Sequence, residues 1–147
     1  MQKLVATCVL LTCALAAYAA QKSIDQMKAE AEKAEGGHQA KLCAELAQLL
    51  VPIADQQFTE GNVVEAQKTV QEILSYATKA RDVSIKSRNK MKETEIGLRT
   101  TQRKLEALKR TLASDDRPPL DAVEKKLEQF RQDILNEMFA PPKKKGS

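Results

Sequence analysis

The longest regular feature of the chain is a stripe of apolar or small residues whose spacing alternates between three and four positions through residues 63–112. Its members are Val63, Ala66, Val70, Ile73, Ala77, Ala80, Ser84, Ser87, Met91, Thr94, Leu98, Thr101, Leu105, Leu108 and Leu112. No proline interrupts this central stripe. A strict seven-residue repeat is typical of a helix that supercoils with partner helices. We therefore expect one helix over residues 63–112, roughly 75 Å long, which is least stable or bends between Ser84 and Thr101, where small polar residues thin the stripe.

Shorter amphipathic segments lie on both sides of the central stripe. Apolar residues at helical spacing predict helices over residues 23–35, 38–59 and 119–139. Gly61-Asn62 and Pro118-Pro119 separate these segments from the stripe, since glycine favours helix ends and proline favours the first helical turn. Connections this short join antiparallel neighbours. The pattern therefore predicts an all-α, elongated fold of antiparallel helical hairpins, or a coiled coil, around one long central helix.

Two features are expected to disturb the first pair of helices. Gly36-Gly37 weakens any helix that runs through it, because glycine loses more backbone entropy than other residues. Pro52 lies inside the most apolar stretch and lacks a backbone donor, so we expect a kink near Gln48.

Composition supports the all-α prediction and argues against catalysis. Aromatic residues make up 3% of the chain, while alanine, leucine, glutamate, lysine and glutamine, which favour helices, dominate it. His38 is the one histidine and lies five residues before Cys43. Two ligands do not make a zinc site, which needs three or four, and no third member of a catalytic triad or Gly-rich phosphate loop stands out. We expect no enzyme activity, no metal and no cofactor.

The N-terminus has the pattern of a secretory signal peptide. Lys3 precedes an apolar run from Leu4 to Leu15, and Ala17-Tyr18-Ala19 resembles a cleavage site. We expect residues 1–19 to be removed near Ala19, so that the protein is exported, either periplasmic or secreted. Residues 20–140 then form one helical domain, and residues 141–147 a disordered basic tail.

Removal of the signal peptide leaves Cys43 as the one cysteine of the mature chain. Cys43 lies between apolar neighbours, and a free cysteine behaves as a small hydrophobic residue. Burial is therefore the favoured interpretation. A disulfide between two chains is the alternative in an oxidising compartment.

Basic residues are concentrated in the second half of the central stripe. Residues 79–112 contain 11 basic and 4 acidic residues, in a chain whose formal net charge is +4. One hypothesis is a surface for an anionic partner, such as an anionic envelope surface, contacted by Arg99, Arg103, Lys104 and by the tail residues Lys143, Lys144 and Lys145. Nucleic acid is not expected, since the exported chain has few aromatic residues for stacking.

The other hypothesis is that the basic block is neutralised within the chain. Folding back at Gly61 brings Glu35 level with Lys86. Folding back at Pro118 brings Glu128 level with Lys104, and Asp133 level with Arg99. Each surface pair contributes about 0–1 kcal/mol, so the pairs would set orientation and register more than stability.

The sequence resembles known helical proteins at one turn and in its overall character. Ala54, Phe58, Gly61-Asn62 and Ala66 resemble the turn of a single tetratricopeptide-type helical hairpin, without a second copy at the 34-residue period. The chain as a whole, with its Asp-Arg-Pro-Pro-Leu sequence at residues 116–120, resembles small exported bacterial all-helical proteins of unknown function. Its size and basic helical character are also similar to periplasmic chaperones of the Spy and Skp kinds, although the Leu-Thr-x-x-Gln motif of the first and the strands of the second are absent from the pattern.

These observations favour a non-enzymatic, exported helical interaction or scaffold protein of the cell envelope. The alternative is a periplasmic chaperone-like or stress-adaptor protein that binds unfolded clients. The partner is expected to be a protein, and the part of the central stripe that the other helices leave uncovered is a candidate surface for a homodimer.

Overall fold

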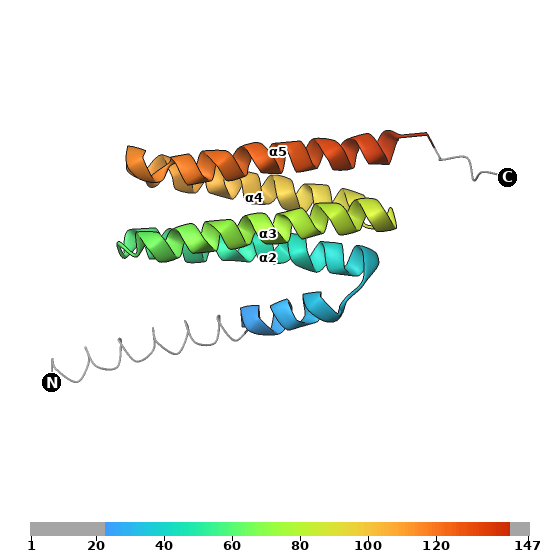
Figure 1. Ribbon diagram of the computed structural model, residues 1–147, viewed down its shortest axis with the longest axis horizontal. Coiled ribbons are helices and arrows are strands. Elements are labelled where there is room, and N and C mark those ends of the chain that lie inside the picture. The colour runs from blue at the N-terminus through green and yellow to red at the C-terminus, as the bar shows by residue number, and fades with distance from the viewer. Residues whose placement is uncertain (1–22, 142–147) are drawn as a thin grey trace, which may run out of the picture.

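A computed structural model describes residues 23–141, which are helical apart from short connections and contain no strand (Figure 1). The predicted all-α fold class is therefore confirmed. The elements are an N-terminal helical segment over residues 23–33, α2 (Gly36–Thr59), α3 (Val63–Ser87), α4 (Met91–Thr111), a short 3₁₀ turn (Ser114–Asp116) and α5 (Pro118–Phe139).

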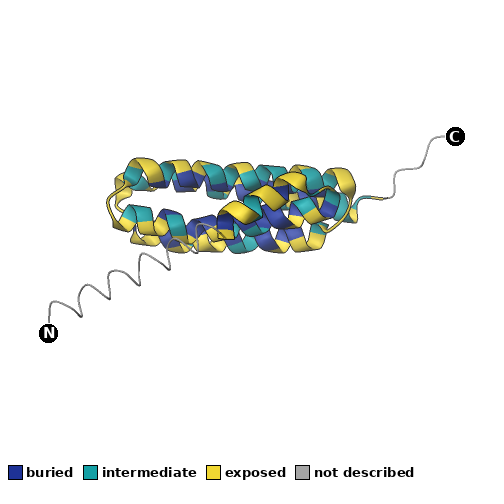
Figure 2. Cartoon of the chain, turned by 90° about the horizontal axis from the view of Figure 1, so that it is seen from below, coloured by how far each residue is buried: buried dark blue, intermediate teal, exposed yellow. Residues whose placement is uncertain are grey.

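Helices α2 to α5 form an antiparallel bundle in which successive helices reverse direction (Figure 1). Helix α2 packs on both α3 and α4, and α5 packs on the same two helices from the other side. Helices α3 and α4, which are consecutive in the chain, therefore lie across a diagonal of the bundle. Figure 2 shows the result: the buried residues face inward and the outer faces are exposed.

The single helix expected over residues 63–112 is instead two helices, so the prediction of one long central helix is wrong. Helix α3 ends at Ser87 and α4 begins at Met91. Arg88 and Lys90 between them adopt left-handed backbone conformations, with φ of 51° and 55°. The break lies inside the segment where the stripe was expected to be weakest.

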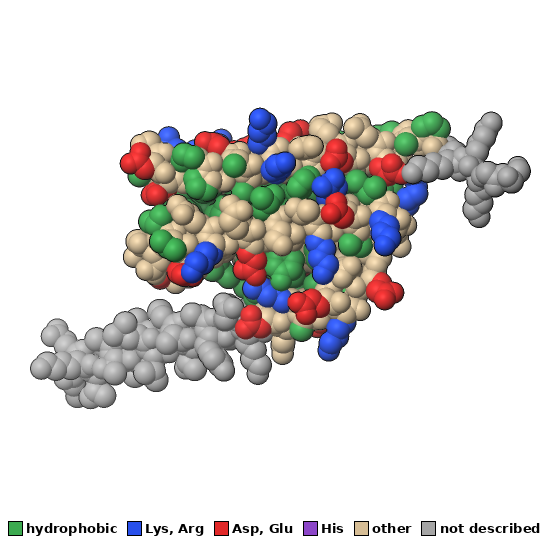
Figure 3. Space-filling view, viewed as in Figure 1, with side chains coloured by type: hydrophobic (Ala, Val, Ile, Leu, Met, Phe, Trp, Pro, Cys, Tyr) green, Lys and Arg blue, Asp and Glu red, His purple; other side chains and the backbone are tan. Residues whose placement is uncertain are grey.

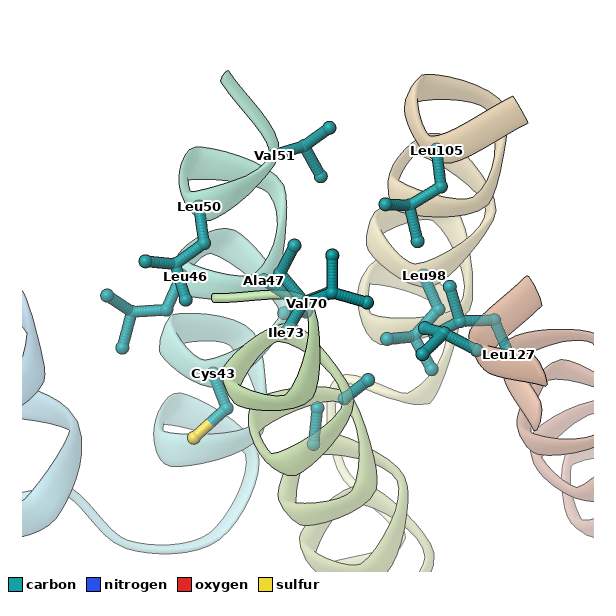
Figure 4. Close-up of a cluster of buried hydrophobic side chains, with 14 of the residues drawn as sticks. Cys43, Leu46, Ala47, Leu50, Val51, Val70, Ile73, Leu98, Leu105 and Leu127 are labelled. Carbon is teal, nitrogen blue, oxygen red and sulfur yellow. The ribbon is translucent and has the colours of Figure 1, made fainter. Parts of the chain in front are cut away.

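The reason for the break is burial of the central stripe by its own chain. Val70 and Ile73 of α3 and Leu98 and Leu105 of α4 are all fully buried. In a straight helix of that length, the flanking helices would leave part of the stripe in water. Reversal at residues 88–90 lets both halves of the stripe face one core, which Figure 4 shows with side chains from α2, α3, α4 and α5.

The N-terminal helical segment packs against the outside of the bundle. Its Ile24 and Ala31 are buried, and Gln39 Nε2 of α2 donates a hydrogen bond of 2.8 Å to the Ala31 carbonyl. Lys28 Nζ lies 2.5 Å from Glu72 Oε1 of α3. Burial alone would lower the pKa of Lys28, but the hydrogen bond and charge of Glu72 outweigh it and raise the pKa overall.

The N-terminal helical segment ends and α2 begins two residues earlier than expected, so Gly36-Gly37 lies in the first turn of α2. The connection is residues 34–35, and α2 begins at Gly36, whose φ is +56°. A Cβ on Gly37 would lie 2.8 Å from side-chain atoms of Asn89 and Lys90, so this glycine lets the 88–90 turn rest directly on α2. Helix α2 then continues through Pro52 to Thr59.

Candidate functional site

Helix α4 presents a set of basic side chains on its outward side. Lys92, Arg103 and Arg110 are exposed and recur at helical spacing together with Arg99, and the exposed Lys104 lies at the edge of this stripe toward α2. We call these five residues the basic α4 face. Lys92 and Arg110 were missed by the sequence interpretation, although their spacing from Arg99 and Arg103 places all four on one side of a helix.

Four members of the basic α4 face make no ion pair within residues 23–141. They are Lys92, Arg103, Lys104 and Arg110, whereas Arg99 is 2.9 Å from Glu95 Oε2. The other described ion pairs that join different helices are Lys28–Glu72, Arg81–Asp133, Arg88–Glu137, Lys109–Asp121, Lys109–Glu124 and Arg131–Glu95. Three basic residues of the 79–112 block, Arg81, Arg88 and Lys109, therefore form ion pairs with acidic residues of α5.

The partners of these α5 acids differ from those expected. Asp133 pairs with Arg81 at 3.2 Å instead of with Arg99, and Glu128 pairs with Arg131 of its own helix at 2.8 Å instead of with Lys104. The reason is that α5 packs on α3 as well as on α4, so Arg81 of α3 is within reach. Neutralisation within the chain therefore covers only part of the basic block.

The prediction that Glu35 and Lys86 lie at the same height along the bundle is confirmed. Both residues line a surface pocket of about 390 Å³ between the start of α2 and the end of α3, with Gly36, Gln39, Val83 and Ser87. The two charges form no ion pair among the described residues, so the pocket brings them near each other without a direct bond.

Glu95 is a nearly buried carboxylate at the inner edge of α4. Its side chain is 7% exposed and lies 3.0 Å from Arg131 Nε of α5 as well as 2.9 Å from Arg99. Arg131 also donates to Gln102 at 3.0 Å and to Glu128 at 2.8 Å. The pKa of Glu128 is lowered chiefly by a hydrogen bond from Gln132, with a contribution from the charge of Arg131. This network holds α4 and α5 in register and fixes the side of α4 that faces outward.

A groove of about 370 Å³ runs beside the basic α4 face, between α2 and α4. Val51, Pro52 and Asp55 of α2 line one side, and Lys104, Ala107, Leu108 and Thr111 of α4 line the other. The groove is therefore mostly apolar, with one cation and one carboxylate at its edges. Sequence interpretation missed it because it forms only where α2 and α4, distant in sequence, lie in parallel.

The face seen in Figure 3 has no comparable cluster. Acidic and basic side chains are interspersed there, and apolar side chains show mainly between the helices. This view covers α3 and α5, in agreement with the ion pairs that join those two helices.

Cys43 is fully buried in the core of α2, in agreement with the favoured interpretation. Burial raises the pKa of its thiol, although the charge of Lys79 acts in the opposite direction. A disulfide between two chains would require the core to open. The tail residues Lys143, Lys144 and Lys145 and the predicted signal peptide lie outside the described residues.

No group of three or more metal-ligating side chains occurs within residues 23–141, and His38 is exposed there. In the same range no helix has the length and apolar character to cross a membrane. Comparison of the chain with protein-family models, curated proteins and solved structures finds no match. Functional inference therefore depends on the surface of the bundle.

Proposed function

We propose that this chain is a non-enzymatic, exported helical interaction protein of the cell envelope that binds an acidic protein partner through the basic α4 face. The observation that supports this most directly is the set of exposed cations Lys92, Arg103, Lys104 and Arg110, which have no ion pair within residues 23–141. Export rests on the signal-like pattern of residues 1–19.

The groove between α2 and α4 adds an apolar surface beside the basic α4 face. Charge complementarity speeds association and selects partners, but affinity usually depends on a buried apolar centre with a polar rim. Val51, Pro52 and Leu108 offer such a centre, and Lys104 lies at its edge. Ile96, a large apolar side chain that is 43% exposed, lies on the same outward stripe between Lys92 and Arg99.

The alternative chaperone-like function has less support. Among the described residues four large apolar side chains are exposed, namely Leu49, Val64, Ile96 and Phe139. They belong to four different helices, and Val64 and Phe139 lie near opposite ends of the bundle. A surface for unfolded clients would require a contiguous apolar area.

The test is a pair of charge reversals matched in net charge. Arg103→Glu with Arg110→Glu alters the basic α4 face, and Lys125→Glu with Lys126→Glu makes the same change in charge on exposed positions of α5. Binding of residues 20–147 to polyglutamate is measured by titration calorimetry at low and high salt. We expect the α4 pair to weaken binding at least about tenfold. The α5 pair should have a smaller effect, because the cations that it reverses lie away from the proposed binding surface.

Three other results would point elsewhere. Equal loss in both pairs means that only net charge matters, which contradicts a specific α4 surface. Binding to vesicles of anionic phospholipid, without binding to polyglutamate, replaces the protein partner by a lipid surface. Suppression of the aggregation of an unfolded client, unchanged in the α4 pair, favours the chaperone-like function.

A further inference from the structure

The turn between α3 and α4 is short and contains neither glycine nor proline. It consists of Arg88, Asn89 and Lys90, and two of these three residues adopt positive φ. The left-handed region is unfavourable for residues with a Cβ, and such strain persists only where the surroundings impose it. Short strained connections of this kind favour exchange of elements between copies of a chain.

The same residues are compatible with a continuous helix. The central stripe passes through the turn without a slip, from Ser84 and Ser87 to Met91 and Thr94. If residues 88–90 became helical, the apolar positions of α3 and α4 would lie on one face of a single helix of roughly 75 Å. The heptad pattern is thus a second, independent observation, which indicates that this sequence can also form one straight helix.

The bundle divides at this turn into two halves that complete each other. The first half is the N-terminal helical segment with α2 and α3, and the second half is α4 with α5. Each half contains its own antiparallel hairpin, and the halves meet where α2 packs on α4 and α3 packs on α5. Either half can meet the opposite half of another molecule with the same contacts.

We propose that two copies of this chain exchange halves. Residues 88–90 straighten in both molecules, and the first half of each copy packs on the second half of the other. Every buried contact between halves is kept, including Arg81 with Asp133. The free energy of the exchanged dimer differs from that of two monomers mainly by three contributions. Release of the strain at Arg88 and Lys90 favours the dimer. Loss of any contact that depends on the bent turn and the entropy of association oppose it.

Two contacts hold the bent form. Arg88 pairs with Glu137 of α5, and Asn89 and Lys90 lie on Gly37 of α2. These contacts oppose the exchange, so the balance depends on protein concentration and on how the chain was folded. The proposal does not depend on the acidic partner, although an exchanged dimer would present two basic α4 faces.

The first experiment compares two double substitutions that remove the same side chains. Arg88→Gly with Lys90→Gly relieves the positive-φ strain and disfavours a helix, whereas Arg88→Ala with Lys90→Ala keeps the strain and favours a helix. Residues 20–147, which include every described residue, are refolded from denaturant at high concentration and analysed by size exclusion with light scattering.

We expect the wild type to form a dimer, the alanine pair to dimerise more strongly and the glycine pair to remain monomeric. The dissociation constants of the two variants should differ by on the order of 100-fold or more, because four hinge positions change in each dimer. Monomers at all concentrations in the wild type and the alanine pair, or equal dimerisation of both variants, would overturn the proposal.

The second experiment distinguishes exchange from simple association of two faces. Arg81→Lys keeps a cation beside Asp133 and allows a carbodiimide to join the two side chains by an amide bond, with loss of one water and conversion of the reagent to its urea. In an exchanged dimer this bond joins two chains, and a denaturing gel shows twice the mass. Arg81→Lys with Asp133→Asn is the control for other cross-links. A dimer whose 81–133 bond stays within one chain would also overturn the proposal.

Discussion

The two ends of the bundle are packed with side chains of different size. At the turn end, where α3 passes into α4, the buried residues are mostly small, with Leu98 and Ile134 as larger exceptions: Gly37, Ala40, Ala44, Ala77, Ala80, Ser84, Thr94 and Gly97. At the aliphatic end, where α2 joins α3 and α4 joins α5, they are mostly large: Leu50, Val51, Val70, Leu105, Leu108, Leu112, Leu120, Val123 and Leu127. Small residues let helix backbones approach closely but remove less apolar area from water.

Polar contacts replace part of that missing burial at the turn end. Arg81, Arg88 and Glu95 each pair with a residue in the second half of α5, and Arg81 also lies 4.7 Å from the centre of the Phe130 ring. The buried Thr94 hydroxyl donates to the carbonyl of Lys90 at 2.8 Å. Such contacts orient helices but contribute less than apolar burial of equal extent, so we expect the turn end to open at lower free energy than the aliphatic end.

The largest effect is expected from shortening a leucine at the aliphatic end. Leu105 is fully buried, and Leu105→Ala should lower the free energy of unfolding by about 2–5 kcal/mol through lost burial and the cavity left behind. Urea denaturation measures the change, and Leu49→Ala, at a position 42% exposed, serves as the control with a smaller loss. Equal losses at both positions would mean that the burial of Leu105 adds nothing to the stability of this end.

A somewhat smaller effect is expected from the buried carboxylate near the turn end. Glu95→Ala leaves Arg131 without its most buried partner, and we expect a loss of about 2–3 kcal/mol, less than for a fully isolated charge because Glu128 and Gln102 remain. Glu93→Ala, on the exposed side of the same helix, should change stability little. If the two variants unfold at the same urea concentration, the Glu95 network contributes nothing to holding α4 on α5.

Enlarging a small residue at the turn end should also be unfavourable. A Cβ on Gly97 would lie 2.9 Å from the Ala44 Cβ and 3.2 Å from Gln48 Nε2. Gly97→Ala should therefore lower stability by about 1–2 kcal/mol, although alanine favours a helix by about 1 kcal/mol over glycine. A double-mutant cycle with Ala44→Gly gives the measurement. Favourable coupling confirms close packing, and a stabilising Gly97→Ala contradicts it.

The smallest effect is expected at the ion pairs of the aliphatic end, where Lys109 Nζ lies 2.7 Å from Asp121 and 2.6 Å from Glu124. Hydrogen bonds from Lys109 to these two acids raise its pKa above the ordinary value of 10.5. A raised pKa means that the folded chain holds the proton more tightly. The contribution, about 0–1 kcal/mol, is thus complete below about pH 10.5 and is lost as pH rises through the folded pKa.

The measurement for this prediction is the stability difference between wild type and Lys109→Met as a function of pH. We expect the difference to favour the wild type near neutral pH and to shrink above about pH 10.5. A difference that is constant with pH would mean that the lysine stem, and not its charge, is responsible.

Much of the local structure was predictable from residue pattern. The 3.6-residue periodicity located the outer ends of the helices to within a few residues, because the apolar face of each helix must be buried, but it joined α3 and α4 into one helix. Gly61 and Pro118 marked two of the three bundle turns, since these residue types have distinct backbone preferences. The burial of Cys43 followed from its apolar neighbours. Arg99, Arg103 and Lys104 were predicted from the concentration of basic residues in 79–112, and their contact with a partner stays a prediction.

Only the tertiary structure decided how these helices meet. Asn89 is a poor helix former and the thin stripe marked this region as weak, but the heptad pattern runs on without a slip, so the local sequence does not fix a reversal of the chain at Arg88-Asn89-Lys90. The turn forms because reversal buries Leu98 and Leu105 against the same core as Val70 and Ile73, and this gain exceeds the strain of two left-handed residues. The diagonal placement of α3 and α4 then selects Arg81 for Asp133 and creates the groove beside Lys104, since both depend on contacts between residues distant in sequence.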